Sequence, residues 1–151
     1  MAESARPLAR SSTSMELGDR AIGDRVVISH LSIGVSNLHR AAAFYDAVLG
    51  SLGYIRIFSG PTSVGYGPPG GPEGLALKQR PPSAIGVDEG FHLAFMTVDQ
   101  AAVDRFYAQA VALGGTNDGA PGLRPAYGPS YYAAFVVDYD GHRLEAVCEQ
   151  A

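Results

Sequence analysis

Hydrophobic and polar positions along the chain follow the same order twice. Over 28–35, polar or small residues alternate with apolar ones, which predicts a strand with one buried face. Apolar residues then recur at helical spacing over 38–52, and Gly53 follows as a natural helix stop. A second alternating strand begins at Phe91, and a second helical pattern covers about 100–113. The chain is therefore expected to contain two units that each begin with a strand and a helix.

The second unit repeats the first at a constant spacing. The pair His30-Leu31 returns as His92-Leu93, and Phe44-Tyr45 returns as Phe106-Tyr107, each 62 positions later. A repeat of this kind indicates a duplicated structural unit. It also places two histidines at equivalent points, so a pseudo-twofold axis between the units would let both histidines reach one site.

Three more strands are expected in each unit, separated by turn residues. They lie at 54–58, 62–66 and 75–79 in the first unit and, in the second, weakly near Thr116 and then at 131–137 and 143–148. The Gly- and Pro-rich sequence over 67–74 and 119–129 is expected to form loops. Module one is thus placed at about 26–80 and module two at about 90–149, each with the order β-α-β-β-β.

The rest of the sequence limits the classes of partner. Residues 1–24 are rich in Ser and Arg and lack hydrophobic periodicity, so we expect a flexible N-terminal extension before a single domain at 25–151. The net charge of −4 and the lack of a basic stripe argue against nucleic acid. No apolar run approaches the ~18 residues of a membrane helix. Cys148 is the only cysteine, which excludes an intrachain disulfide and favours a reducing, cytoplasmic location.

One carboxylate stands out in the last predicted strand. Glu145 lies between two apolar residues, and a buried carboxylate requires a partner or a metal. With His30 and His92 it completes a set of two imidazoles and one carboxylate, which holds Fe(II) and also accepts Mn, Ni, Co or Zn. Glu145 could instead form an ion pair with Lys78 or Arg143, and that pairing would leave no metal site.

Four segments of the chain resemble the vicinal oxygen chelate superfamily, which includes glyoxalase I, extradiol dioxygenases and bleomycin-resistance proteins. They are the strand from His30 to Val35, the Phe44-Tyr45 helix, the strand from His92 to Phe95, and the segment from Asp138 to Glu145. The resemblance covers about 27–148 and implies an α+β fold. In that fold, two βαβββ modules form a curled eight-stranded mixed sheet, a cup, with the helices on the outside. It implies a divalent metal held by His30, His92 and Glu145, with Glu145 also catalytic as a proton shuttle.

The resemblance is incomplete at a fourth ligand position. Aligning Gly141-x-x-Leu144-Glu145 with Gly74-x-x-Leu77-Lys78 puts Lys78 where glyoxalase I has a second glutamate. A protonated lysine cannot ligate a metal and repels a divalent cation. Glyoxalase I activity is therefore not expected.

Substrate-binding residues are expected around the same cup. Strand parity requires that one of two adjacent tyrosines faces the cup, and Tyr132 is assigned that role. Arg124 could hold an anionic substrate group by bidentate contact. Arg143 and Lys78 complete the predicted substrate-binding set.

These observations favour a small metal-dependent enzyme that acts on a small molecule with vicinal oxygens. The metal would polarise those oxygens as a Lewis acid, in a lyase, an isomerase or an extradiol-type dioxygenase. The alternative is a metal-free protein that binds or sequesters a small molecule on the same scaffold. By resemblance, the modules are expected to pair in a homodimer.

Overall fold

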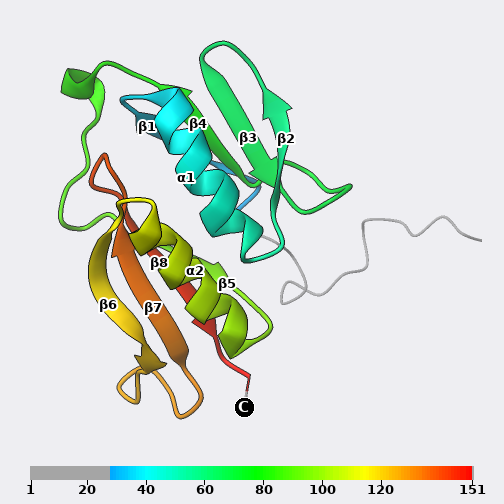
Figure 1. Cartoon of the computed structure of the whole chain (residues 1–151), viewed down its shortest axis with the longest axis vertical. Helices are drawn as coiled ribbons and strands as arrows, with labels where there is room; N and C mark the ends of the chain where they lie inside the picture. Colours follow the sequence, from blue (N-terminus) through cyan, green and yellow to red (C-terminus); the bar gives the residue numbers. More distant parts are fainter. Residues whose placement is uncertain (1–27, 151) are drawn as a thin grey trace, which may run out of the picture.

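The computed structural model describes residues 28–150, so the predicted extension over 1–24 lies outside the described residues. The elements follow the predicted order (Figure 1). Module one contains β1 (Leu31–Val35), α1 (Leu38–Gly50), β2 (Ile55–Ser59), β3 (Ser63–Gly67) and β4 (Leu75–Gln79). A connection with one short 3-10 helix, η2 (Pro82–Ala84), leads to module two. Module two contains β5 (Leu93–Met96), α2 (Gln100–Ala112), β6 (Thr116–Leu123), β7 (Tyr132–Val137) and β8 (Arg143–Cys148).

Hydrogen bonds divide the eight strands into two mixed sheets of four. The first sheet has the order β1-β4-β3-β2 and the second the order β5-β8-β7-β6. In each sheet the first strand of the module pairs in parallel with the last, and the other neighbours are antiparallel. The predicted pair of βαβββ modules is therefore confirmed. Within the described residues, the strands form two sheets rather than one continuous sheet.

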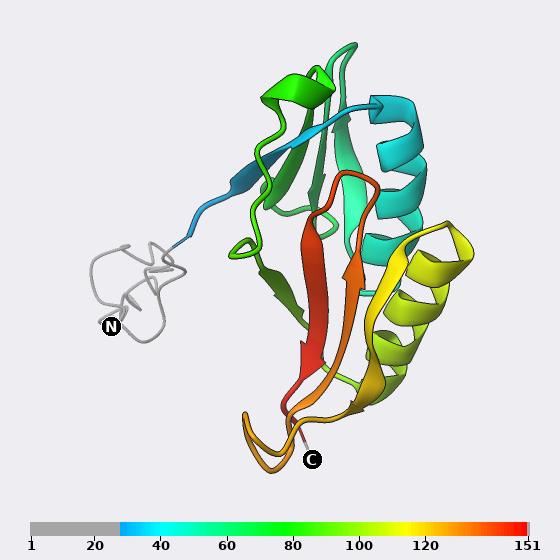
Figure 2. The same ribbon diagram turned by 90° about the vertical axis from the view of Figure 1, so that its left-hand side faces the viewer.

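The two helices lie together on one side of the sheets (Figure 2). α1 packs on the first sheet and against α2, and α2 packs on the second sheet. The opposite face of each sheet carries no helix, and we call it the cup face of that module. The helices are thus on the outside, as expected.

The buried core lies between the helices and the sheets. α1 begins after Asn37, whose side chain accepts a hydrogen bond from the backbone N–H of Arg40. The apolar face of α1 then meets the inner faces of β3 and β4, where Val64 and Leu77 are almost fully buried. Gly53 has a φ of +86°, which lets the chain turn away after the helix. Among the described residues, no helix has the length and apolar character needed to cross a membrane.

β6 is the element that departs most from the sequence prediction. A weak strand near Thr116 and a loop from 119 were expected, but β6 continues to Leu123. It is an edge strand, and its register with β7 shifts on either side of Gly119. Edge strands with bulges tolerate Gly and Pro, so composition alone predicted a loop where the structure has a strand.

Candidate functional site

Glu145 lies at the centre of the polar groups on the cup face of module two. Its neighbours in β8, Leu144 and Ala146, belong to the buried core, so strand alternation turns Glu145 to the opposite face. The Glu145 side chain is nevertheless only 4% exposed. A carboxylate buried to this degree requires hydrogen-bond partners.

Two side chains supply these partners. His92, which directly precedes β5, places Nε2 at 2.6 Å from Glu145 Oε2. The hydroxyl of Tyr131 donates to Glu145 Oε1, also at 2.6 Å. Burial and the hydrogen bond to a carboxylate raise the pKa of Tyr131, so its hydroxyl stays protonated. The His92 side chain is 44% exposed, so the cluster joins a solvent-accessible imidazole to a buried carboxylate.

The third predicted ligand, His30, lies at the equivalent point of module one. It precedes β1 as His92 precedes β5, it is exposed, and its Nδ1 lies 3.1 Å from Ser29 Oγ. No group of three or more His, Cys, Asp or Glu side chains suited to a metal converges within residues 28–150. One chain therefore brings His92 and Glu145 together but does not add His30 to them.

The two adjacent tyrosines point to opposite faces of the second sheet. Tyr132 donates to Asp104 of α2 at 2.7 Å, so it lies on the helix side. Tyr131 is the tyrosine that reaches Glu145 on the cup face. The structure thus places the predicted substrate-binding residue Tyr132 away from the cup, and the sequence reasoning missed Tyr131. Alternation was the available signal, but it does not reveal which of two neighbouring tyrosines faces the core.

The two predicted arginines lie on the same sheet as Glu145. Arg143 shares its face of β8, and its Nε lies 3.6 Å from Asp118 Oδ2. Arg124 places its guanidinium carbon 5.4 Å from the ring centroid of Phe135. Phe135 lies opposite Glu145 in the pairing of β7 with β8. Both arginines therefore belong to the cup face of module two.

Lys78 does not occupy the position equivalent to Glu145. Glu145 pairs with Ala94 of β5, whereas the partner of Ser32 in β1 is Ala76. Because Ser32 and Ala94 are 62 positions apart in the repeat, the counterpart of Glu145 is Ala76. The predicted alignment is thus wrong by two residues, since the turns that precede β4 and β8 differ in length. Lys78 lies on the same face, is exposed, and pairs with Gly34.

A carboxylate that the sequence reasoning did not identify lies on the cup face of module one. Gly65 of β3 pairs with Ala76, and a Cβ on Gly65 would come within 2.0 Å of Glu73 Oε1. The Glu73 side chain therefore occupies the space above Gly65, beside the counterpart of Glu145. Glu73 was missed because it lies in the Gly- and Pro-rich loop before β4, where neither strand parity nor the repeat marks it.

A second polar cluster is buried on the helix side and ties the modules together. Tyr45 of α1 donates to Asp138 Oδ2 at 2.7 Å, and His142 Nδ1 lies 2.8 Å from the same oxygen. Burial alone would raise the pKa of Asp138, but the hydrogen bond and charge of His142 and the hydrogen bond from Tyr45 outweigh it and lower the pKa. The cluster links α1 of module one to the turn between β7 and β8, so its role is structural.

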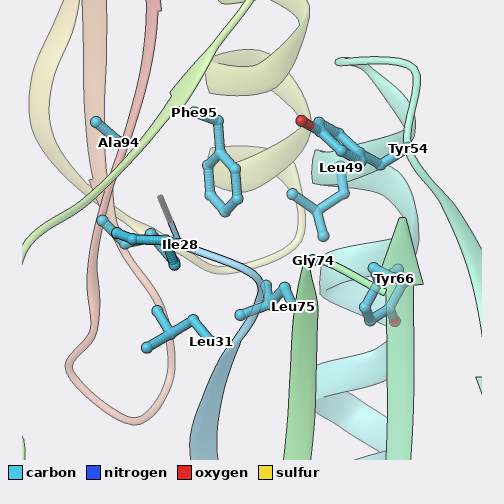
Figure 3. A pocket seen from close by; sticks show the side chains of 10 residues that line it. Ile28, Leu31, Leu49, Tyr54, Tyr66, Gly74, Leu75, Ala94 and Phe95 are labelled. Carbon is cyan, nitrogen blue, oxygen red and sulfur yellow. The ribbon is translucent and has the colours of Figure 1, made fainter. Parts of the chain in front are cut away.

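An apolar pocket of about 240 Å³ opens between the modules (Figure 3). Leu31, Leu49, Leu75 and Tyr54 from module one face Phe95 from module two across it. No imidazole or carboxylate is among the described residues that line it. His92 and Glu145 themselves do not line it, but Ala94, which does, pairs with Glu145 in the second sheet.

The fold and the pair on the cup face together define a class: paired βαβββ modules with a His–carboxylate couple on the open face of a sheet. The sequence profile of the Glyoxalase/Bleomycin resistance protein/Dioxygenase superfamily matches residues 27–146, and the chain belongs to this superfamily.

Solved structures share the fold over most of the chain. A glyoxalase/bleomycin resistance protein from Albidiferax ferrireducens matches with a TM-score of 0.68 and 28% identity, covering 80% of this chain and 96% of that one. A family enzyme from Burkholderia phytofirmans gives 0.64 and 20% identity, with 82% and 98% covered. The fosfomycin resistance protein FosX from Listeria monocytogenes gives 0.62 and 18% identity, with 82% and 93% covered. The last two likenesses show the fold alone. No curated protein matches the chain.

Proposed function

We propose that the protein is a divalent-metal-dependent enzyme that acts on a small substrate with adjacent oxygens, and that it works as a homodimer. The observation that carries this proposal is the 2.6 Å contact between His92 Nε2 and Glu145 Oε2. A neutral imidazole and a carboxylate are both suitable ligands for Fe, Mn, Ni, Co or Zn. Tyr131 supports the pair from outside, because outer hydrogen bonds orient ligating carboxylates.

A second copy of the chain would complete the ligand set. His30 is exposed at the point of module one that corresponds to His92, yet it does not join the pair within residues 28–150. In the proposed dimer, His30 of the partner subunit approaches His92 and Glu145, and twofold symmetry creates two such sites. Exposed apolar residues on the edge strand β2 support association with another copy. Ile55, Ile57 and Phe58 are 48%, 39% and 52% exposed.

Each residue of the cluster has a distinct chemical role in this proposal. When bound, a divalent cation polarises the adjacent oxygens of the substrate as a Lewis acid. Glu145 would accept a proton from the substrate and return it, because its Oε2 lies beside His92 on the side of the carboxylate that Tyr131 does not occupy. Tyr131 keeps Oε1 engaged, which leaves Oε2 to act beside His92.

Glu73 supplies a second carboxylate in the same proposal. It lies above Gly65 and beside Ala76, the strand residue that corresponds to Glu145. Glu73 and His30 both belong to module one, so both would approach the His92–Glu145 pair of the partner subunit. Ala76 has no carboxylate to match that of Glu145. In this proposal the loop residue Glu73 supplies a carboxylate at that position instead.

The second candidate is a metal-free protein that binds a small molecule. The same contacts favour it, because His92 and Tyr131 already satisfy the buried carboxylate of Glu145 without a metal. In that case the pair is an ion pair or a neutral hydrogen bond, and a ligand binds over it.

Metal titration separates the two candidates. Chelator-stripped protein would be titrated with Fe(II), Mn(II), Ni(II), Co(II) and Zn(II) by calorimetry under anaerobic conditions. Stoichiometric binding that is lost in His92→Ala supports the metal enzyme, and screening of diols, catechols and hemithioacetals would follow. The matched control is His39→Ala, which removes an exposed histidine of α1 outside the cup. If no metal binds, or if both variants bind as well as the wild type, the metal proposal is wrong.

A further inference from the structure

We infer that Arg124 is an oxyanion-binding residue and that the substrate carries a carboxylate, phosphate or phosphonate group. This inference deepens the proposed function and rests on it for the position of the reacting atoms. Four features of the structure support it: a fixed backbone, a prepared seat for the guanidinium, a free charge, and closeness to the His92–Glu145 pair.

Both the backbone N–H and the backbone carbonyl of Arg124 form hydrogen bonds. Its N–H donates to the carbonyl oxygen of Tyr131 at 2.8 Å. Its own carbonyl accepts hydrogen bonds from the N–H groups of Tyr127 at 2.9 Å and Gly128 at 3.4 Å. The loop that carries Tyr131 to Glu145 therefore also fixes Arg124. A binding residue on such a supported loop is positioned before the ligand arrives.

The guanidinium lies in a seat formed by two glycines and an aromatic ring. A Cβ on Gly119 would come within 3.3 Å of Arg124 Nη2, and a Cβ on Gly122 within 3.2 Å of Nη1. Both contacts are tighter than ordinary packing, so the missing side chains make the room that the guanidinium uses. The ring of Phe135 lies beneath it, with 5.4 Å between the ring centroid and the guanidinium carbon.

The positive charge of Arg124 is not neutralised by a carboxylate within residues 28–150. Arg143 and Arg56 each form an ion pair with an aspartate. Arg124 instead donates to backbone carbonyl oxygens, chiefly that of Ala120 at 2.6 Å. A guanidinium has five N–H groups, so several are left to bind an oxyanion.

The position of Phe135 places this charge beside the proposed catalytic pair. Its ring centroid is 5.8 Å from that of His92, and Phe135 pairs with Glu145 across the two strands. One small molecule could therefore place an anionic group on Arg124 and its reacting atoms at the His92–Glu145 pair. This arrangement assigns the substrate to the class of small oxyanions rather than neutral diols.

Calorimetry on metal-free protein tests the inference. The probes would be inorganic phosphate, acetate and phosphonoacetate, with ethylene glycol as the neutral comparison. We expect saturable binding of at least one anion and none of ethylene glycol, and the preferred anion tells carboxylate from phosphate chemistry. Arg124→Gln should weaken that binding by about tenfold or more, the worth of charge-assisted hydrogen bonds. Failure of every anion to bind would overturn the inference.

Two further variants exclude trivial explanations. Arg40→Gln is the matched control, because Arg40 also stacks on an aromatic ring, that of Tyr139 at 3.5 Å, but does so beside α1. Its anion binding should equal that of the wild type, and an equal loss in both arginine variants would contradict the inference. Gly122→Ala keeps the charge but crowds the guanidinium of Arg124, so it should also weaken anion binding. Unchanged anion binding in this variant would contradict the role of Gly122 in making room for the guanidinium. Since no metal is present, failure of the metal proposal leaves these results intact.

Discussion

The two modules share one scaffold but carry different side chains on their cup faces. Module two presents Phe135 and Glu145 at the centre of its sheet. The pairing of strands places Gly65 and Ala76 at the corresponding points of module one. The two modules thus share strand order and helix packing, whereas the buried carboxylate with its hydrogen-bond partners lies on module two.

This difference shows that two modules with the same strand order need not carry the same polar side chains. Small residues on module one leave room, and Glu73 from a loop lies in part of that room. Module two supplies a buried carboxylate with its partners already in place. In the proposed site, module one would contribute His30 and Glu73, and module two would supply the His92–Glu145 pair.

Removal of the module-two carboxylate should have the largest effect. In Glu145→Gln, the charge beside His92 is lost while the shape is kept, so metal affinity should fall by at least about 100-fold, since a direct ligand matters more than an outer partner. Calorimetric titration with Ni(II) and Zn(II) measures the change. Glu149→Gln removes an exposed carboxylate four residues later and should bind as the wild type does. Equal affinities in the two variants would show that Glu145 is not a ligand.

The adjacent tyrosines give the next largest effect and a close control. Tyr131→Phe removes the hydrogen bond to Glu145 Oε1, so metal affinity should fall by roughly 10- to 100-fold, as for other outer partners of ligands. Tyr132→Phe removes a bond to Asp104 on the helix side and should leave metal affinity unchanged. A stronger effect of Tyr132→Phe would contradict the placement of Tyr131, rather than Tyr132, beside the metal site.

The repeat provides its own control for stability. Tyr45→Phe removes a hydrogen bond to buried Asp138 and should lower the free energy of unfolding by about 1–2 kcal/mol. Tyr107→Phe changes the counterpart in module two, which is less buried, and should cost less. Denaturant unfolding of both variants measures the difference.

The loss in Tyr45→Phe should also depend on pH. The pKa of Asp138 is lowered in the folded protein, so its stabilising effect is present above the ordinary carboxyl pKa and disappears as the pH falls through the lowered value. The gap between wild type and Tyr45→Phe should therefore narrow in acid. A gap that widens as the pH falls would contradict an ionised Asp138.

Charge changes on module one should have the smallest effect. Glu73→Gln should weaken metal binding by roughly tenfold or less, because its carboxylate comes from a loop rather than a strand. Lys78→Gln should leave metal affinity unchanged, since Lys78 lies two residues from the counterpart of Glu145. Calorimetry on both variants measures these affinities. A larger effect of Lys78→Gln than of Glu73→Gln would support the alignment of Lys78 with Glu145 that the sequence predicted.

Strand and helix periodicity predicted most of the fold, because alternation and helical spacing survive in sequence. The bounds of β4 and β8 match the prediction at both ends. The same parity placed Glu145 on the face opposite the core. Periodicity could not predict the full length of β6, because its Gly- and Pro-rich sequence does not alternate. There a bulged edge strand forms where the composition predicted a loop.

The candidate site was predicted less completely than the fold. Turn glycines are a poor guide to register, so Lys78 was aligned where strand pairing puts Ala76. Strand alternation does not show which of two adjacent tyrosines faces the cup, and for this reason Tyr132 was predicted instead of Tyr131. Glu73 depends on a loop conformation, and loop conformations do not follow from hydrophobic patterns.

A mixing experiment tests most directly whether one metal site is built from two chains. His30→Ala and His92→Ala would each be purified, shown to bind no metal, and then mixed under conditions that exchange subunits. If His30 of one copy joins His92 and Glu145 of the other, mixed dimers contain one intact site, and random exchange restores about a quarter of the wild-type sites. Calorimetry with Ni(II) should detect that recovery. No recovery after demonstrated exchange would contradict the shared site.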